Sequence, residues 1–284
     1  MDVEATVTHE LAAFLRTRRE RLSPGDVALP AGSRRRRTPG LRREEVAELA
    51  GVSIDYIVRL EQGRGLNPSP DVLESLARAL RLSDDERVYL FTLAGQRPTD
   101  RGRVPDVPAH TPTAQLVHDL SPLPAMLLDH RLDIVAWNRE MSALLDLDTL
   151  AAPQLNALEL CLFNPGQRAV YLDREQVIRD GVADLRAAWA AYPDDAQLSA
   201  RIRSWCGRSE EFVRLWELRD VRVNGRGRKR LLHPLIGHVT LDFDVLHPLP
   251  DARERLVIYR AADAASQAAL TRLTESPHVS QSSA

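Results

Sequence analysis

Hydrophobic residues recur three and four positions apart along the first 95 residues, a spacing that places them on one face of a helix. The pattern predicts a first helix from about Thr8 to Leu22. Gly51 separates two shorter helices within residues 41–63. Further helices are expected from Ser69 and from Ser83 to Ala94, where Ser83 and Glu86 have the spacing of a capping box. Five helices in this length predict a compact all-α domain over residues 1–95.

The join between the second and third predicted helices is unusually short. Gly51 tolerates the positive φ of a tight turn, and Ser53 is a residue type that caps a helix N-terminus. Two short helices joined in this way form a helix-turn-helix, whose second helix fits the major groove of DNA. DNA binding is therefore the first functional hypothesis.

The pattern changes after residue 95. Four prolines among polar residues predict a semi-rigid linker over 96–115. In 116–275, strands are expected at 131–137 and 256–259, and Val239, Leu241, Phe243 and Val245 alternate with polar residues as in a half-buried strand. Helices are expected at 138–145 and 173–192, from Asp194 or Asp195 to about Gly207, and from Ser209. A hairpin turn is expected at 224–227 and a disordered tail at 276–284, so the fold class is α+β overall.

Composition is typical of a globular protein, with 44% hydrophobic and 27% charged residues. Because no signal peptide or long apolar run is present, we expect a cytoplasmic protein with no membrane contact. Cys161 and Cys206 lack the spacing of metal ligands. The net charge of −2 is unevenly distributed: residues 14–64 contain 12 Arg and 7 acidic residues, a local balance of +5. This local charge favours duplex DNA as a partner.

Helical geometry divides the residues after Ser53 into an inner and an outer face. Ile57 and Leu60 point inward, which leaves the outer face for base contacts. Arg59 there can bind guanine through two hydrogen bonds, Asp55 can accept from cytosine, and Ile54 can pack on a thymine methyl. Arg42 and Arg43 lie at the start of the helix that precedes Gly51, where free backbone N–H groups favour a phosphate. The alternative is a helical hairpin in a bundle core, which would not require a basic flank.

Two segments, Thr38-Pro-Gly-Leu-Arg-Arg-Glu-Glu-Val-Ala47 and Tyr56-Ile-Val-Arg-Leu-Glu-Gln-Gly-Arg64, resemble lambda-repressor/Cro-like (xenobiotic-response-element type) regulators that carry an MmyB-like domain. The resemblance extends through residues 127–138, 212–216 and 232–243. It implies base contacts from Ser53, Ile54, Asp55 and Arg59, and backbone contacts from Arg42, Arg43, Tyr56 and Gln62, with Arg64 in the same motif. It also implies a structural pair between Arg19 and Glu61.

The run Arg34–Arg37 lies in a connector that is longer than in the minimal repressor domain. We take Arg35, Arg36 and Arg37 as candidates for phosphate or minor-groove contact. The alternative is a solvated loop.

For the second domain the resemblance implies a PAS-like fold, an antiparallel sheet covered by helices that encloses an apolar cavity. A separate aromatic-rich domain in a regulator suggests a sensor for a small apolar ligand, such as a fatty or aromatic metabolite. Its candidate ligand residues are Trp137, Phe163, Trp189, Trp205, Phe212, Trp216, His233, Leu241, Phe243 and Tyr259. Each of these side chains could instead fill a core, and His233 could be a structural histidine.

Neither catalysis nor a cofactor is expected. His233 and His238 alone do not indicate haem, and the chain lacks the nucleophile-elbow, P-loop, zincin and dinucleotide motifs. Three hypotheses remain: a ligand-responsive transcription regulator, a DNA-binding protein whose second domain only dimerises or binds other proteins, and a protein-interaction adaptor. The family's two-fold pairing implies a homodimer on an inverted-repeat operator.

Overall fold

The computed structural model describes residues 3–27, 40–64, 67–96, 112–151, 155–223, 225–248 and 253–275. They form two compact units. The helical unit comprises the described residues up to 96 together with 186–205 and 213–223. The sheet unit comprises the described residues from 112 to 185, 206–212 and those from 225 onward. The helical unit thus includes two segments that lie far beyond the predicted 1–95 boundary.

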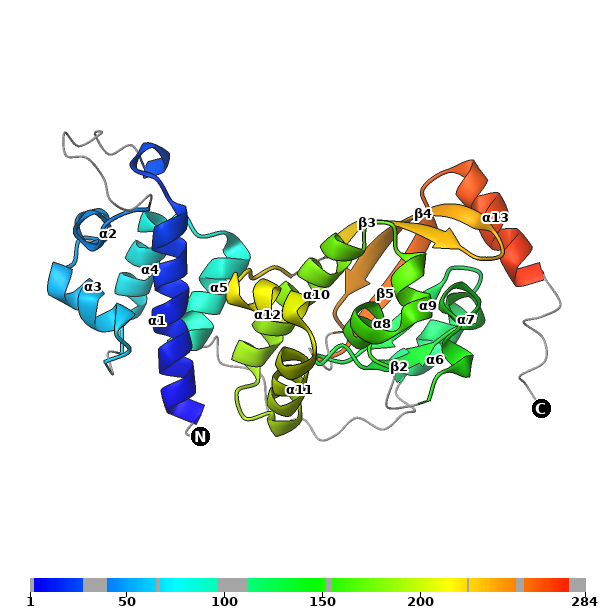
Figure 1. The fold of residues 1–284 in the computed structure, drawn as a ribbon, viewed down its shortest axis with the longest axis horizontal. Coiled ribbons are helices and arrows are strands. Elements are labelled where there is room, and N and C mark those ends of the chain that lie inside the picture. Colours follow the sequence, from blue (N-terminus) through cyan, green and yellow to red (C-terminus); the bar gives the residue numbers. More distant parts are fainter. Residues whose placement is uncertain are drawn as a thin grey trace. The chain divides into compact units, whose positions relative to one another are not determined.

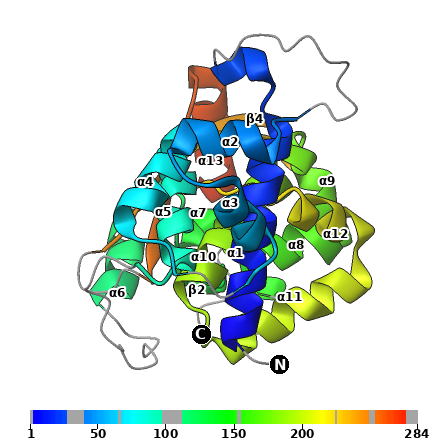
Figure 2. The same ribbon diagram turned by 90° about the vertical axis from the view of Figure 1, so that its left-hand side faces the viewer.

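The helical unit begins with the five predicted helices. They are α1 (Val3–Arg21), α2 (Arg43–Ala50), α3 (Ile54–Glu61), α4 (Pro70–Ala79) and α5 (Asp84–Leu93), with a short 3₁₀ helix η1 at Pro24–Val27. α1 contacts α3 and α5, while α2 contacts α3 and α4 (Figure 1; Figure 2). Phe14, Leu73 and Leu90 meet in the core of this unit, and each is fully buried.

Local sequence explains where these helices begin and end. Gly51 adopts φ +66° after α2, and the Ser53 hydroxyl accepts a hydrogen bond from the Tyr56 backbone N–H at 3.1 Å. Ser69 caps α4 in the same way, and Ser83 and Glu86 form the predicted capping box on α5. The helix-turn-helix geometry is therefore confirmed.

Gly40 is required by a close approach to α1 before α2 begins. A Cβ atom at this position would lie 2.6 Å from the backbone of Glu20. The next residue, Leu41, is buried, and its N–H donates to the Arg19 carbonyl at 3.1 Å. Glycine thus lets the chain dock on the end of α1 and leads it into the helix-turn-helix.

Three more helices carry residues of the helical unit. They are α10 (Arg174–Ala191), α11 (Ala196–Arg208) and α12 (Glu210–Glu217). Asp195 caps α11 by accepting from Leu198, and Ser209 caps α12, both as predicted. The end of α10 and the residues after α12 join the core of the helical unit through Ala190 and Val221. This assignment was not predicted from the sequence.

The sheet unit contains five antiparallel strands in the order β2-β1-β5-β4-β3. Their bounds are β1 (Ala125–Leu128), β2 (Ile134–Trp137), β3 (Arg226–His233), β4 (Gly237–Leu246) and β5 (Arg255–Ala261). The α+β class is thus confirmed. In β4 the predicted inner face is buried at Val239 and Leu241 but only partly buried at Phe243 and Val245.

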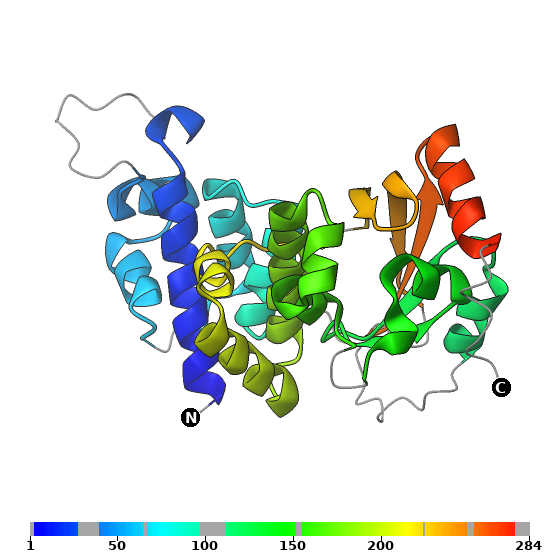
Figure 3. The ribbon, with the colours of Figure 1, turned by 45° about the vertical axis from the view of Figure 1, so that its right-hand side comes forward.

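The sheet unit also contains helices. They are α6 (Pro112–Asp119), α7 (Arg139–Leu145), α8 (Ala157–Phe163), α9 (Pro165–Val170) and α13 (Ala264–Glu275), with a 3₁₀ turn η2 at Leu147–Thr149. α6 contacts β1 and β2, and α9 contacts β3. α13 contacts β4, β5 and α7, and Figure 3 shows this red helix beside the orange strands of the sheet. The sheet is therefore contacted by helices at both ends of its strand order.

Some elements differ from the sequence prediction. The predicted turn at 224–227 is wrong, since β3 begins at Arg226 and the hairpin turns at residues 234–236, with Gly237 at φ +75°. Proline at 234 favours this turn because its fixed φ and missing N–H suit a loop. Residues 112–115, predicted as linker, form the start of α6, where proline is tolerated in the first turn. Residues 97–111 and 276–284 lie outside the described residues.

Candidate nucleic-acid interface and ligand-binding residues

The recognition helix α3 presents the predicted base-contacting residues to solvent. Ile54 is 52% exposed although it is a large apolar side chain, and Ser53, Asp55 and Arg59 are exposed as well. Ile57 and Leu60 face the core with 3% and 4% exposure. The division into an inner and an outer face therefore follows the predicted one. An exposed isoleucine at the start of a helix is available for contact with a thymine methyl group.

Arg59 is the cation on α3 best placed for base contact. Its guanidinium makes no hydrogen bond or ion pair with the part of the chain that the structure describes. Three further residues are predicted to contact DNA. Gln62 and Arg64 are exposed just after the helix, and Tyr56 is partly buried. All four remain candidate DNA contacts.

Arg42 and Arg43 differ in the acidic residues that they contact. Arg42 precedes α2, and its guanidinium lies 3.2 Å from the carboxylate of Glu44 on the surface. Arg43 is the first residue of α2, and its Nε donates to Glu61 Oε2 at 2.7 Å while its side chain remains 44% exposed. Arg43 thus has a structural partner, and the exposed part of its guanidinium can still reach a phosphate.

Glu61 is the centre of an ion-pair cluster that holds the helix-turn-helix on α1. Its carboxylate is 3% exposed and accepts from Arg19 Nε at 2.6 Å and Arg19 Nη2 at 3.1 Å, in addition to Arg43. Arg19 also donates to the Leu41 carbonyl at 2.9 Å. The predicted pair between Arg19 and Glu61 is present, and it ties three elements together. Arg35, Arg36 and Arg37 lie outside the described residues.

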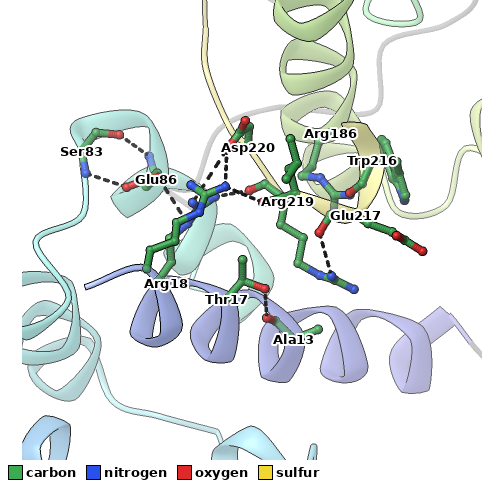
Figure 4. A network of polar contacts seen from close by, with 12 residues as sticks. Ala13, Thr17, Arg18, Ser83, Glu86, Arg186, Trp216, Glu217, Arg219 and Asp220 are labelled. Atoms are coloured by element: carbon green, nitrogen blue, oxygen red, sulfur yellow. Dashed lines mark hydrogen bonds and ion pairs between the residues drawn. The ribbon is translucent and has the colours of Figure 1, made fainter. Parts of the chain in front are cut away.

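A second polar network joins α1 and α5 to the later segments of the helical unit (Figure 4). Arg18 is 3% exposed and its Nε lies 3.2 Å from Glu86 Oε1. Its guanidinium also donates to the Arg219 carbonyl and lies 4.0 Å from Asp220. Arg21 adds a hydrogen bond to Asp220 at 2.5 Å. The segment after α12 is therefore fixed to α1 by charged groups.

Arg186, at the end of α10, completes this network. It is 1% exposed, forms an ion pair with Glu10 of α1, and donates to the Trp216 carbonyl. Its guanidinium also stacks 3.9 Å from the Trp216 ring centroid. Tyr89 of α5 donates to the same Glu10 carboxylate at 3.2 Å. Sequence reasoning missed Glu10 and Arg186, because 176 positions separate them and no motif links them.

The predicted ligand residues divide between the two units. Trp189, Trp205 and Trp216 belong to the helical unit, where Trp189 packs on its core and stacks edge-on with Trp216 at 6.4 Å. The others belong to the sheet unit: Trp137, Phe163, Phe212, His233, Leu241, Phe243 and Tyr259. The structure thus places only part of the set in the sheet unit.

Several of the sheet-unit residues have structural partners. Trp137 donates to Asp148 at 2.8 Å, and Phe163 packs under the guanidinium of Arg208 at 4.0 Å. Phe212 is fully buried. The residues that share a sheet row are Phe243 and Tyr259, which are paired between β4 and β5 with ring centroids 5.9 Å apart.

His233 is a buried histidine with both ring nitrogens in contact with the backbone. Its Nδ1 accepts from the Leu235 N–H at 3.2 Å, and its Nε2 lies 3.3 Å from the Ala143 carbonyl. Burial lowers the pKa of His233, and the Ala143 carbonyl opposes this shift. The neutral ring with its proton on Nε2 satisfies both contacts, as expected for a structural histidine.

Two ranges of the chain match known protein families. Residues 10–90 match a helix-turn-helix domain, and residues 110–273 match the MmyB-like transcription regulator ligand binding domain. No curated protein matches the chain. Among the described residues, no helix is long and apolar enough to cross a membrane. The chain is a DNA-binding transcription regulator rather than an enzyme, and it belongs to the family of regulators with an MmyB-like ligand-binding domain.

Proposed function

We propose that this regulator senses a small apolar molecule in its ligand-binding domain and adjusts its affinity for an operator accordingly. One observation carries the proposal: helix α10 begins at Arg174 in the sheet unit and ends at Ala191 in the helical unit. The family domain over 110–273 thus supplies part of the unit that contains the helix-turn-helix. A shift at the start of α10 has a direct covalent route to the DNA-binding helices.

The contacts inside the helical unit extend this route from α10 to α3. Arg186 of α10 pairs with Glu10 near the start of α1. Near its other end, α1 holds the recognition helix, since Arg16 donates to the Glu61 carbonyl at 2.7 Å and Arg19 binds the Glu61 carboxylate. Because α1 is a single helix, displacement of its Glu10 end changes the support of α3. Allosteric couplings of about 1–3 kcal/mol are typical for such linked sites.

The test measures ligand binding and operator binding on the same protein. An operator is first selected from random duplexes with the full chain, and its affinity is followed by fluorescence anisotropy. Straight-chain alcohols such as dodecanol and aromatic metabolites such as indole then serve as probes. We expect at least one probe to bind in calorimetry and to change operator affinity about 5- to 150-fold over the same concentrations.

As a control, operator binding is measured in the same assay for a helix-turn-helix protein that lacks the second domain. The probes should leave the operator affinity of this protein unchanged. If no probe binds the ligand-free chain, and operator affinity never changes, the second domain serves dimerisation or protein contact instead.

A further inference from the structure

The segment that follows α12 is held in the helical unit mainly by polar contacts. We call residues 218–223 the strap; they belong to the same unit as α1 and α5. Val221 is 7% exposed and packs in the core of the unit. Val223 is 42% exposed, and its N–H donates to Asp85 of α5 at 3.0 Å. One buried apolar side chain is little for six ordered residues, so the position of the strap depends on its polar contacts.

These polar contacts converge on the last turn of α1. Arg18, which is 3% exposed, donates to the Arg219 carbonyl, and Arg21 donates to the Leu218 carbonyl at 2.7 Å. Arg21 also binds the Asp220 carboxylate at 2.5 Å. The guanidinium of Arg18 lies 4.0 Å from the same carboxylate, as Figure 4 shows. Asp220 is thus the acidic side chain that both arginines of this turn share.

The backbone of Arg219 indicates that these contacts determine the conformation of the strap. Its φ is +51°, in the left-handed region that a residue with a side chain adopts only where its surroundings impose it. In this conformation the Arg219 carbonyl accepts from Arg18, and its Nε lies 3.4 Å from Glu10 Oε1. The strap is therefore folded against α1 in one specific arrangement.

Arg18 is shielded from water, so its acidic partners must compensate its charge. Its other partner is Glu86 of α5, at 3.2 Å from Arg18 Nε, and burial raises the pKa of this carboxyl group. Glu86 also accepts from the Ser83 N–H at 3.0 Å as part of the capping box. Because Glu86 serves two groups, removal of Asp220 would leave the buried guanidinium incompletely compensated.

The same turns of α1 hold the recognition helix from another side. Arg16 donates to the Glu61 carbonyl at 2.7 Å, and Arg19 binds the Glu61 carboxylate. Positions three apart share a helix face, so residues 16 and 19 form one row and residues 18 and 21 form the neighbouring row. The last carbonyls of a helix have no partner within it, and this end frays unless other groups hold it. The strap thus holds the end of α1 that supports α3.

We propose that Asp220 is a positioning residue for operator recognition. By binding both arginines of the last turn of α1, it fixes this turn, which holds Glu61 and thereby the reading face of α3. This role needs no ligand and therefore goes beyond the proposed function. Asp220 lies outside the helix-turn-helix match of residues 10–90 and inside the match of residues 110–273. Sequence-specific binding by the first domain then requires a residue of the second.

The test compares the affinity of the full chain for a selected operator with its affinity for an unrelated duplex of the same length. For Asp220→Ala we expect the ratio of the two affinities to fall about tenfold, comparable with the effect of one mismatched base pair. Affinity for the unrelated duplex and its salt dependence should stay unchanged, because the phosphate contacts are retained. Asp220→Glu keeps the charge and should restore most of the ratio.

Glu217→Ala is the matched control. Glu217 is exposed at the end of α12, and its carboxylate makes no hydrogen bond or ion pair with the part of the chain that the structure describes. Its removal should leave the ratio unchanged. Asp220→Asn keeps the size of the side chain and serves as a milder variant, for which we expect an intermediate loss.

Hydrogen exchange gives a second readout, of position rather than affinity. Asp220→Ala should speed the exchange of backbone amides in the last turn of α1 and in α3, and should leave α4 unchanged. A melting curve shows whether each variant is folded at the temperature of the titrations.

The outcomes decide the role of Asp220. An unchanged affinity ratio in folded Asp220→Ala, or an equal fall in Glu217→Ala, overturns the proposal. A fall of both affinities by the same factor indicates general loss of folded protein and also overturns it. If Asp220→Ala does not fold, Asp220→Asn is judged by the same criteria.

Discussion

Glu61 shows how one buried side chain fixes the orientation of the recognition helix. A carboxylate with 3% exposure requires compensation for its lost hydration, and two arginines from different helices provide it. Because Arg19 and Arg43 converge on the same group, α1, α2 and α3 are held in one arrangement. The exposed face of α3 is thereby rigidly presented to solvent, a property that base readout needs.

Arg59 should determine specificity at one base pair. We expect Arg59→Ala to cost about 1–3 kcal/mol at that position and to relax the preference there, because the bidentate guanine contact is lost. Arg42→Ala should instead weaken all sequences alike and flatten the salt dependence, since it removes a phosphate contact. Selection from random duplexes with each variant checks both outcomes. An unchanged site preference for Arg59→Ala would mean that α3 is not the reading helix.

His233 should make the stability of the sheet unit depend on pH. Its folded-state pKa is lowered by burial, so below the unfolded pKa of about 6.5 the unfolded chain binds a proton that the native state does not. The contribution of His233 to the free energy of unfolding is then constant above this pH. It falls as the pH decreases below this value, by up to about 1.4 kcal/mol per pH unit. Denaturant unfolding between about pH 5 and 8 measures the slope. His233→Gln should reduce the slope, and an identical slope in this variant would assign the effect to other groups.

Helix α10 contributes residues to both units. Its first turns belong to the sheet unit and its last turns to the helical unit, with Arg186 the first residue on the helical side. The end of α10 contributes Ala190 to the core, and the Arg186–Glu10 pair fixes it to α1. The end of α10 is therefore part of the packing of the helical unit.

We therefore expect changes at Arg186 to uncouple the two activities. Arg186→Met alone removes the buried cation of Glu10 and leaves it only the partly exposed Arg219, whose Nε lies 3.4 Å from Glu10 Oε1. It should destabilise the helical unit by about 1–3 kcal/mol. Combining it with Glu10→Gln removes the weakly compensated charge while keeping an acceptor for Tyr89. The double variant should recover stability, bind ligand and DNA, and lose most of the effect of one on the other.

Arg179→Met on the same helix is the control for this experiment. Arg179 is 41% exposed and pairs only weakly with Glu175, so its removal should leave coupling unchanged. Anisotropy titrations with and without ligand provide the comparison. Full coupling in the double variant would rule out the Arg186 contact as the route.

At the scale of the whole molecule, one helix-turn-helix presents too little surface for tight operator binding. A single module buries about 600–1,000 Å² of protein surface, whereas specific complexes bury up to about 2,500 Å². We expect the full chain to form a homodimer that binds two half-sites about one helical turn apart. Light scattering, alone and on a selected operator, gives the mass. A monomeric mass in both states, or a selected site without two-fold symmetry, would contradict this arrangement.

The sequence alone determined the helices of the DNA-binding motif and the face that α3 exposes. Caps and hydrophobic spacing are local signals, so Ser53, Ser69 and Ser83 mark helix starts, and Gly51 marks the turn without reference to the rest of the chain. The alternation in β4 was equally readable. Short buried segments such as β1 were not, because four consecutive apolar residues carry no period.

The tertiary structure alone decided which distant residues share a core and which charges are matched. Glu10 and Arg186 lie 176 positions apart, and the residue types of each alone predict a surface charge. Lys229 likewise looks like one cation in a basic strand until the register places it beside Phe243 and Tyr259. Burial and pairing are properties of the folded arrangement, since desolvation and Coulomb attraction depend on distances that only folding sets.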